Sequence, residues 1–480
     1  MAPTHEAQPP HAAPPEAWEP LLRLARFAYR PLEKFLRIQA ASGVVLIVAA
    51  VAALAWANSP WGDSYTHLWE TPLGLRVGPF AFERPLHWVI NDGLMVIFFF
   101  VVGLEIRREM HHGELSDLRR ATLPLVAALG GMAAPALVYL AVAGAQATRS
   151  GWGVPMATDI AFAVGVFALL GHRVPAALRI LLLAVAVIDD LGAIVVIALF
   201  YSSGIAWSGL GVAVLGVGGI LLLQWLGVRS RQAYVVPALI IWAGVYASGV
   251  HPTIAGVLIG LLTPVRAWLG PQGFLDEVKG QVGKLADADL ATLSPHALAG
   301  LLGEVDSARR EAMSPAESLI ELLHPWVAFF IMPVFALANA GVDLRGLSLD
   351  GSTALVAVGA ALGLIIGKPV GIFGVSMLAL KVGLARLPKG LTTRHVVVLG
   401  LVAGIGFTMS LFIAQLAFAD HALLGAAKLG VLAASGFMAL VGCGVGYWLL
   451  RPHTQVAPPP SVDEAEHPAP VDEAPPPAAS

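Results

Sequence analysis

The chain has 480 residues, of which 57% are hydrophobic and only 13% charged, and its mean hydropathy is +0.75. This composition excludes a soluble domain and indicates a polytopic membrane protein surrounded by lipid. The net charge of −3 is small, and we expect no nucleic-acid partner. The one cysteine, Cys443, lies in an apolar run, which excludes disulfides and cysteine metal sites.

Both ends of the chain have compositions that cannot form a packed core. Residues 1–20 are rich in proline, alanine and glutamate, and residues 453–480 are acidic and proline-rich. Such segments bury too little apolar surface to fold, so we predict disordered tails around one membrane domain at 21–452. The N-terminal region lacks the apolar core of a cleavable signal peptide, so we expect the first span to act as its own insertion signal.

Apolar segments follow one another along the membrane domain, each near the ~20 residues that cross the hydrocarbon layer. We predict an all-α protein of twelve transmembrane helices, in which the fourth and eighth segments are short and the tenth is long. The segments are 38–57, 87–106, 121–143, 155–170, 176–200, 206–226, 233–250, 252–265, 323–341, 353–380, 396–418 and 425–450.

The distribution of lysine and arginine predicts how these segments are oriented. With the N-terminus in the cytoplasm, most of the 29 basic residues fall in cytoplasmic loops. The opposite side receives only Arg76, Arg84, Arg149, Arg345 and Lys428. We therefore expect an even number of spans with both termini cytoplasmic.

Two connecting loops are long. The outer loop, 58–85, contains LGLRVGPFAFE, in which apolar and polar residues alternate around Gly78-Pro79, a pattern that predicts a small β-hairpin. The inner loop, 267–315, is polar and of mixed charge, and we interpret it as a mobile or partly helical insertion without chemistry of its own.

Three carboxylates lie where lipid-facing helices would have aliphatic residues. Asp159 follows Thr158 in the fourth segment, and Asp189 and Asp190 are neighbours in the fifth. An ionised carboxylate at bilayer depth costs at least ~2.5 kcal/mol, so such residues usually face a bundle interior and handle protons or cations. The alternative is that they are structural hydrogen-bonding groups between helices.

The two neighbouring aspartates cannot face the same partner, because adjacent helical residues point about 100° apart. One is expected to coordinate a ligand while the other pairs or titrates. A hard cation such as sodium or lithium prefers oxygen ligands, which carboxylates, the Thr158 hydroxyl and free backbone carbonyls provide. Burial favours the protonated carboxyl, so the same oxygens can also bind protons. One site that holds either a cation or protons is the minimum that exchange requires.

Two segments carry the signature of interrupted helices. Pro155 and Ala157 precede Thr158-Asp159, which predicts a helix start inside the fourth segment. In the eleventh, AGIGFTMS, the residues Gly404, Gly406 and Thr408 interrupt an apolar run. Paired interruptions in corresponding halves indicate a transporter built from inverted repeats. Alternatively, the glycines only allow close helix packing.

Lys368, in GLIIGKPVGI, is a lone cation in the tenth segment. A buried lysine needs a carboxylate partner or loses its proton, and Asp189 or Asp190 is the candidate partner. Whether Lys368 itself carries a proton stays open at this point. The alternative is a side chain that reaches the membrane surface.

Two clusters of charged and titratable residues lie at the predicted cytoplasmic ends of spans. Glu105 lies within the second apolar run, one turn from Arg108 and Glu109. Glu321 and His324 form a second pair at the start of the ninth segment. Mixed charges at such a position usually form a solvated helix end, and a role in pH sensing is the competing hypothesis for both groups.

Seven stretches of the sequence together resemble the NhaA family of sodium/proton antiporters, from about residue 36 to 451. They are INDGLMVIFFFVVGLEIRRE, PMATDIAFAVGVFALLGHRVP, VAVIDDLGAIVVIALFY, SGVHPTIAGVLIG, HPWVAFFIMPVFALANAG, GKPVGI and AGIGFTMSLFIAQLAF. The resemblance implies twelve helices in inverted repeats, with the fourth and eleventh unwound and crossing at mid-membrane. It also implies an electrogenic, pH-regulated exchanger of a bacterial inner membrane, which takes in protons and expels sodium or lithium. No enzymatic activity and no cofactor are expected.

The resemblance also assigns roles to residues. Asp190 would be the principal carboxylate for cation and proton, and Asp189 its partner, paired with Lys368. Asp159 and Thr158 would line the crossing, and Glu105, Arg108 and Glu109 would belong to a pH-response region. The sequence departs from the family pattern at the start of the ninth segment, where Ile320-Glu321 replaces the expected acidic residue and histidine and only His324 is kept. The outer hairpin at 71–84 would be the contact of a homodimer.

Two other classes of protein share some of these features. An intramembrane aspartyl protease needs two carboxylates on facing helices, whereas Asp189 and Asp190 are neighbours in sequence and no Gly-x-Gly-Asp motif occurs. A passive cation channel is the stronger alternative, because the residues that bind a cation are of the same types in a channel and in an exchanger. The interrupted helices and Lys368 favour alternating access over a channel.

Overall fold

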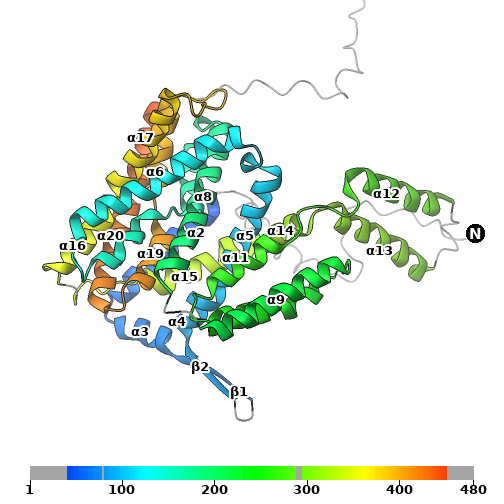
Figure 1. Cartoon of the computed structure of the whole chain (residues 1–480), viewed down its shortest axis with the longest axis horizontal. Helices are drawn as coiled ribbons and strands as arrows, with labels where there is room; N and C mark the ends of the chain where they lie inside the picture. The colour runs from blue at the N-terminus through cyan, green and yellow to red at the C-terminus, as the bar shows by residue number, and fades with distance from the viewer. Residues whose placement is uncertain are drawn as a thin grey trace, which may run out of the picture.

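The computed structural model describes residues 40–450 except 78–79, 203, 205, 229, 288–293 and 347. The predicted tails at 1–20 and 453–480 and the Gly78-Pro79 turn lie outside the described residues. The described part is helical apart from one two-stranded antiparallel sheet, as the sequence predicts (Figure 1).

The first half of the chain runs through the hairpin into the most buried helices. Its elements are α2 (Ala40–Ala57), α3 (Gly62–Glu70), β1 (Pro72–Val77), β2 (Phe80–Pro85), α4 (Leu86–Trp88), η1 (Val89–Leu94), α5 (Met95–His112), η2 (Glu114–Ser116), α6 (Leu118–Ala143), η3 (Arg149–Met156), α7 (Ile160–Leu170), η4 (Gly171–Arg173), α8 (Ala176–Phe200) and α9 (Trp207–Trp225).

The second half contains the insertion at 267–315 and the second interrupted helix. Its elements are η5 (Arg231–Tyr234), α10 (Val235–Ala247), α11 (Thr253–Leu262), α12 (Gly270–Asp287), α13 (Pro295–Ala312), α14 (Pro315–Trp326), η6 (Val327–Ile331), α15 (Met332–Asn339), α16 (Ser352–Leu362), η7 (Gly363–Gly367), α17 (Lys368–Lys381), α18 (Thr393–Ala403), α19 (Phe407–Ala417) and α20 (His421–Leu449).

The described residues contain eight helical runs long and apolar enough to cross a membrane, or ten if each of two bent pairs is one span. The bent pairs are α2 with α3, at 112°, and α18 with α19, at 47°. Every predicted segment contains a helix, but α10 and α11 have only 13 and 10 residues. Gly249, with φ of 81°, and Pro252 separate these two helices, and Pro264 follows α11 closely.

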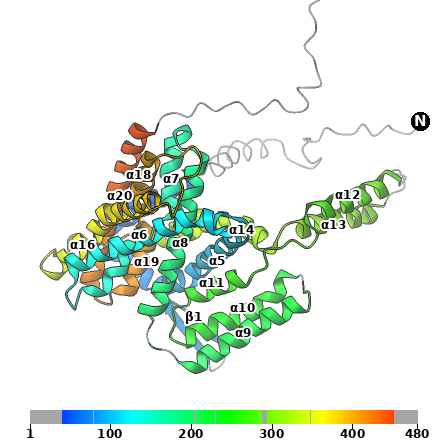
Figure 2. The ribbon, with the colours of Figure 1, turned by 45° about the horizontal axis from the view of Figure 1, so that its top comes forward.

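The centre of the molecule is formed by the segments that carry the aspartates. In the runs 149–173 and 176–200, 72% and 67% of the most hydrophobic 18-residue stretch is buried inside the protein. In the other six long runs the buried share of that stretch is 22–56%. These two apolar runs therefore face protein rather than lipid. The pair α9 and α10 lies at one edge, beside α11 (Figure 2).

The helix that carries Lys368 packs very closely on α6. A Cβ added at Gly367 would come within 2.6 Å of the Pro135 Cα, and one added at Gly371 would overlap the Gly130 carbonyl oxygen. Only glycine permits this approach of two backbones, as at many helix contacts in membranes. The contact fixes α17, and with it Lys368, against the centre of the molecule.

The outer loop forms the predicted hairpin. Strands β1 and β2 pair from Pro72↔Pro85 to Val77↔Phe80, and the hairpin projects from the helices (Figure 1). The Arg84 guanidinium holds its base by donating to the Tyr246 hydroxyl of α10, at 2.7 Å. The inner insertion is helical over α12 and α13, which pack on each other and extend away from the other helices (Figures 1 and 2).

The contact of α17 with α6 makes a prediction about stability. Gly371→Ala forces a methyl group into the Gly130 backbone and is expected to cost about 1–3 kcal/mol, the usual range for overpacking. Gly374→Ala on the same helix meets no atom within 4 Å and serves as the matched control. Thermal unfolding of the purified proteins in detergent should show a lower midpoint only for Gly371→Ala. Equal midpoints for the two variants would contradict the packing account.

Candidate functional site

The two interrupted helices contact each other at their breaks. Between η3 and α7 the chain is extended, and the Asp159 backbone N–H donates to the Ile405 carbonyl oxygen at 2.8 Å. Thr158 Oγ1 lies 3.2 Å from the Ala403 carbonyl oxygen. Carbonyl oxygens that have no helical partner at the end of α18 thus contact polar groups of the residues just before α7. The predicted interruptions at Thr158-Asp159 and Gly404–Gly406 are confirmed, and the two breaks form one crossing.

Asp159 holds this crossing together with both of its carboxylate oxygens. Oδ1 accepts from the Phe162 backbone N–H at 3.0 Å, which caps the start of α7 as the sequence predicts. Oδ2 accepts from the Thr408 backbone N–H at 3.1 Å and from the Thr408 hydroxyl. One carboxylate therefore binds the N-terminal ends of two half-helices, where the helix dipoles favour a negative charge. Gly406 lies at the tightest point, where a Cβ would come within 3.1 Å of the Ala157 carbonyl oxygen.

Lys368 pairs with Asp189, the first of the two adjacent aspartates. Its ammonium lies 2.7 Å from Asp189 Oδ2 and also donates to the Met156 carbonyl oxygen. The Thr158 hydroxyl donates to the same Asp189 oxygen at 2.7 Å. The exposed fraction of the Lys368 side chain is 0%, so the alternative of a side chain reaching the membrane surface is wrong. The ion pair joins α17, α8 and the crossing.

Asp190 has a different environment. It is 1% exposed, and neither of its carboxylate oxygens has a hydrogen-bond partner among the described residues. Asp189 Oδ1 and the Ser410 hydroxyl are likewise buried without a described partner. A buried polar group left unpaired costs about 1–3 kcal/mol, more if it is charged. These oxygens are the group able to accept a cation or a proton, whereas Asp159 fits the alternative of a structural hydrogen-bonding group.

The two groups considered for pH sensing lie on neighbouring helices. Glu105, Arg108 and Glu109 lie on α5, which packs on α14, and α14 carries Glu321 and His324. Arg108 lies 3.6 Å from Glu109, which also accepts from the Glu114 backbone N–H at 3.2 Å. Glu105 is partly buried, whereas Glu321 and His324 are exposed. The structure thus brings the two groups to one end of a helix pair.

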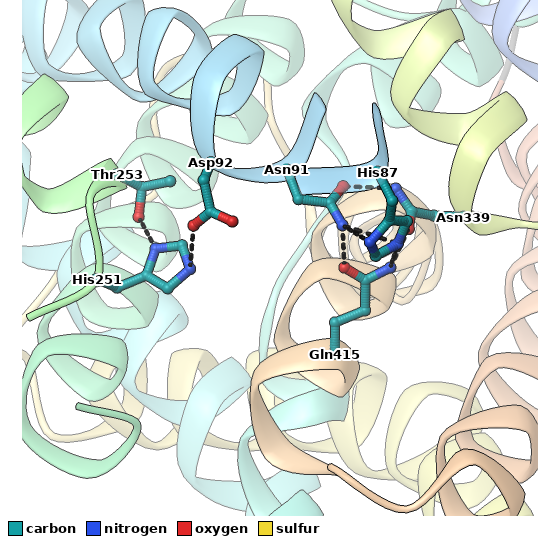
Figure 3. Close-up of polar contacts among 7 residues, drawn as sticks. All are labelled: His87, Asn91, Asp92, His251, Thr253, Asn339 and Gln415. Carbon is teal, nitrogen blue, oxygen red and sulfur yellow. Dashed lines mark hydrogen bonds and ion pairs between the residues drawn. The ribbon is translucent and has the colours of Figure 1, made fainter. Parts of the chain in front are cut away.

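The structure also shows a polar cluster that the sequence analysis did not single out. Asn91, Asn339 and Gln415 hydrogen-bond one another, and His87 lies against them (Figure 3). Each is one polar residue in or beside an apolar run, a weak signal when taken alone. Only the fold brings them together from three distant parts of the chain.

Comparison with known proteins gives consistent matches over most of the chain. The sequence profile described as Na+/H+ antiporter 1 matches residues 33–445. The chain is 64% identical over 455 residues to "Na(+)/H(+) antiporter NhaA 2" of Myxococcus xanthus, covering 95% of this chain and 97% of that protein. It is 56% identical to a protein of the same description from Sorangium cellulosum, over 95% of this chain and 97% of that protein. It is 49% identical to "Na(+)/H(+) antiporter NhaA" of Cupriavidus necator, over 89% of this chain and 92% of that protein.

The buried ion pair of Lys368 and Asp189 predicts how single and double substitutions change the stability of the protein. Lys368→Met leaves Asp189 buried without its cation, and removing one partner of a buried pair typically costs about 3–5 kcal/mol. Adding Asp189→Asn removes the uncompensated charge, so the double variant should recover much of the loss. Thermal unfolding midpoints of the purified proteins in detergent provide the measurement. A double variant less stable than Lys368→Met would show that the pair is not the source of the effect.

Proposed function

Because this chain belongs to the NhaA family of Na+/H+ antiporters, we propose that it expels sodium or lithium in exchange for protons, moves net charge and responds to pH. The protein is a multi-pass membrane transporter of sodium and protons and not an enzyme. We further propose twelve spans in inverted repeats, both termini in the cytoplasm, and a bacterial inner membrane as its location.

The proposal rests on the Asp190 carboxylate. Its two oxygens are buried without a partner among the described residues, and Asp189 Oδ1, on the neighbouring residue of α8, is likewise unpaired. Sodium and lithium prefer such oxygen ligands, and the same oxygens accept protons when the cation leaves. Occupation by a cation and by protons is therefore mutually exclusive, which couples the two flows. Asp190 is assigned as the principal ligand and Asp189 as its partner.

Lys368 is assigned a structural role in this scheme. Its ammonium donates to Asp189 Oδ2 and to the Met156 carbonyl, and so fixes α17 against the crossing. Electrogenic exchange needs two protons per cation. One is carried by Asp190, and the other by Asp189 in a state in which its pair with Lys368 has opened, so that no proton is taken from the lysine. Thr158 orients Asp189, and Asp159 with Thr408 holds the two half-helices in place.

The crossing supports alternating access rather than a passive channel. Half-helices α7 and α19 begin at one shared carboxylate and end on opposite sides of the proposed membrane, so movement of the pair can expose the site to either side. The groups on α5 and α14 lie at the proposed cytoplasmic end of this assembly, where Glu105, Arg108, Glu109, Glu321 and His324 are the candidates for the pH response.

We propose that the outer hairpin joins two copies into a homodimer. Within the described residues β1 and β2 pair only with each other, so each strand has a free edge that a second copy can extend. Arg84 fixes the base of the hairpin to α10. The side chains of residues 75–82 lie outside those that the structure describes.

The assignment of Asp190 predicts the effect of removing its charge. Asp190→Asn removes the oxygen charge that holds the cation, so sodium-dependent proton release in proteoliposomes should be lost while folding is kept. Asp276→Asn, an exposed carboxylate on α12, is the matched control and should exchange normally. Flux with and without an imposed pH gradient distinguishes antiport from a channel. Substantial exchange by folded Asp190→Asn would refute the assignment.

The proposed dimer contact predicts the effect of removing the hairpin. Deleting residues 72–84 should give monomers in detergent that still exchange sodium for protons, because the hairpin lies far from the crossing in the chain and projects from the helices. A native gel or light scattering reports the mass, and proteoliposome flux reports activity. A deleted protein that stayed dimeric would place the contact elsewhere.

A further inference from the structure

Three side-chain amides form a closed ring at one end of the helices. Asn91 Nδ2 donates to Gln415 Oε1 at 2.6 Å, Gln415 Nε2 donates to Asn339 Oδ1, and Asn339 Nδ2 donates to Asn91 Oδ1 at 2.9 Å (Figure 3). Each amide thus donates once and accepts once within the ring. Asn339 is completely buried and Asn91 is 6% exposed. We name Asn91, Asn339 and Gln415 the outer amide ring.

The ring joins three elements that are far apart in sequence. Asn91 lies on η1 at the start of the second predicted span, Asn339 is the last residue of α15, and Gln415 lies near the end of α19. The hairpin leads directly into α4 and η1, so the ring lies at the end that the positive-inside pattern places outside the cell. The His87 ring, one turn before Asn91, lies 3.1 Å from Asn339 Oδ1.

Gln415 is connected to the crossing by a single short helix. Thr408, which donates to Asp159, is at the start of α19, and Gln415 follows two turns later on the same helix. The axial distance between them is about 10 Å at 1.5 Å per residue. Because α19 has only 11 residues and no break, displacement at the crossing is passed directly to the ring.

A second contact packs against α19 near Gln415. The Phe412 ring meets the His251 ring edge-on, with 5.3 Å between centroids. His251 lies 3.2 Å from Asp92 Oδ1 and 2.8 Å from Thr253 Oγ1. The π-helical turn η1 directs Asn91 and Asp92 to opposite sides, one toward Gln415 and the other toward His251 (Figure 3). The half-helix is therefore enclosed by η1, α15 and the turn before α11.

We infer that the outer amide ring is a latch that keeps the outer side of the ion site closed, with Gln415 as its moving part. This inference rests on the proposed exchange by alternating access. Two of the three ring bonds involve Gln415, whereas the third joins Asn91 to Asn339 on the stationary side. Outward opening separates α19 from η1 and α15. It breaks the two Gln415 bonds of the ring and the 3.4 Å contact of Gln415 Nε2 with His87 Nε2, but keeps the Asn91–Asn339 bond. Water replaces amide hydrogen bonds at small net cost, which suits a latch that must open in every cycle.

The first test compares two equal substitutions. Gln415→Leu keeps the size of the side chain but can neither donate nor accept. Gln224→Leu is the matched control, because Gln224 of α9 also donates between helices, to the Leu262 carbonyl oxygen at 2.7 Å, but does not contact α19. Half-saturating sodium for exchange is measured with sodium added to the cytoplasmic face and to the outer face, in vesicles of both orientations.

Loss of the latch favours the outward-open state, so the two faces respond in opposite directions. For Gln415→Leu, half-saturating sodium should rise on the order of threefold at the cytoplasmic face and fall at the outer face. Gln224→Leu should leave the ratio between faces unchanged. No change in that ratio for Gln415→Leu would overturn the latch. Absence of exchange in the unaltered protein would instead contradict the proposed function itself.

A cross-link provides the second test, should Gln415→Leu fail to fold. In a Cys443→Ser background, Asn91→Cys with Gln415→Cys is bridged by a short reducible bis-thiol reagent. Exchange should stop on bridging and return on reduction, because α19 is tied to η1. The control pair, Asn91→Cys with Asn339→Cys, bridges two residues of the stationary side and should continue to exchange. Continued exchange in the first bridged protein, or an equal block in both, would overturn the inference.

Discussion

The interaction on which the rest of the structure depends is the double use of the Asp159 carboxylate. One oxygen caps α7 and the other accepts from the backbone and hydroxyl of Thr408 at the start of α19. Two interrupted helices would otherwise bury free N–H groups, which the interior of a membrane protein does not tolerate without partners. Because a single buried side chain meets both needs, the breaks must lie against each other, and the positions of Thr158, Ile405 and Gly406 follow from that contact.

The crossing gives the two adjacent aspartates different hydrogen-bonding environments. Thr158 and Lys368 both donate to Asp189 Oδ2, so this carboxylate is held by its neighbours. Asp190 lies one residue further along α8 and faces a different direction, where neither oxygen meets a partner among the described residues. A carboxylate with one oxygen held by two donors, beside a carboxylate without any described partner, gives a site that is fixed in position while its charge can change. Helix α19 connects the crossing to Gln415 and the outer amide ring.

Much of this arrangement is readable in the sequence, because a charge in an apolar run is costly and therefore conspicuous. The helix start at Asp159, the break at Gly404–Gly406 and the hairpin at 72–85 are predicted from local patterns and confirmed. Composition left Asp189 and Asp190 as equal candidates for Lys368, since the choice depends on how α17 packs on α6. The outer amide ring was not predicted, because Asn339 and Gln415 are uncharged and their partners are distant in sequence. The short α11 agrees with the prediction for the eighth segment. The short α10 was not predicted, because hydropathy gives the length of an apolar run but not where a helix ends.

The central claim is that one set of buried oxygens holds either sodium or protons. Adding sodium to the purified protein in weakly buffered detergent solution tests it most directly, with released protons followed by a pH indicator and sodium affinity measured across a pH range. The account predicts that sodium binding releases protons, that its affinity falls as the pH is lowered, and that both effects disappear in Asp190→Asn. Sodium binding with an affinity independent of pH and without proton release would contradict it.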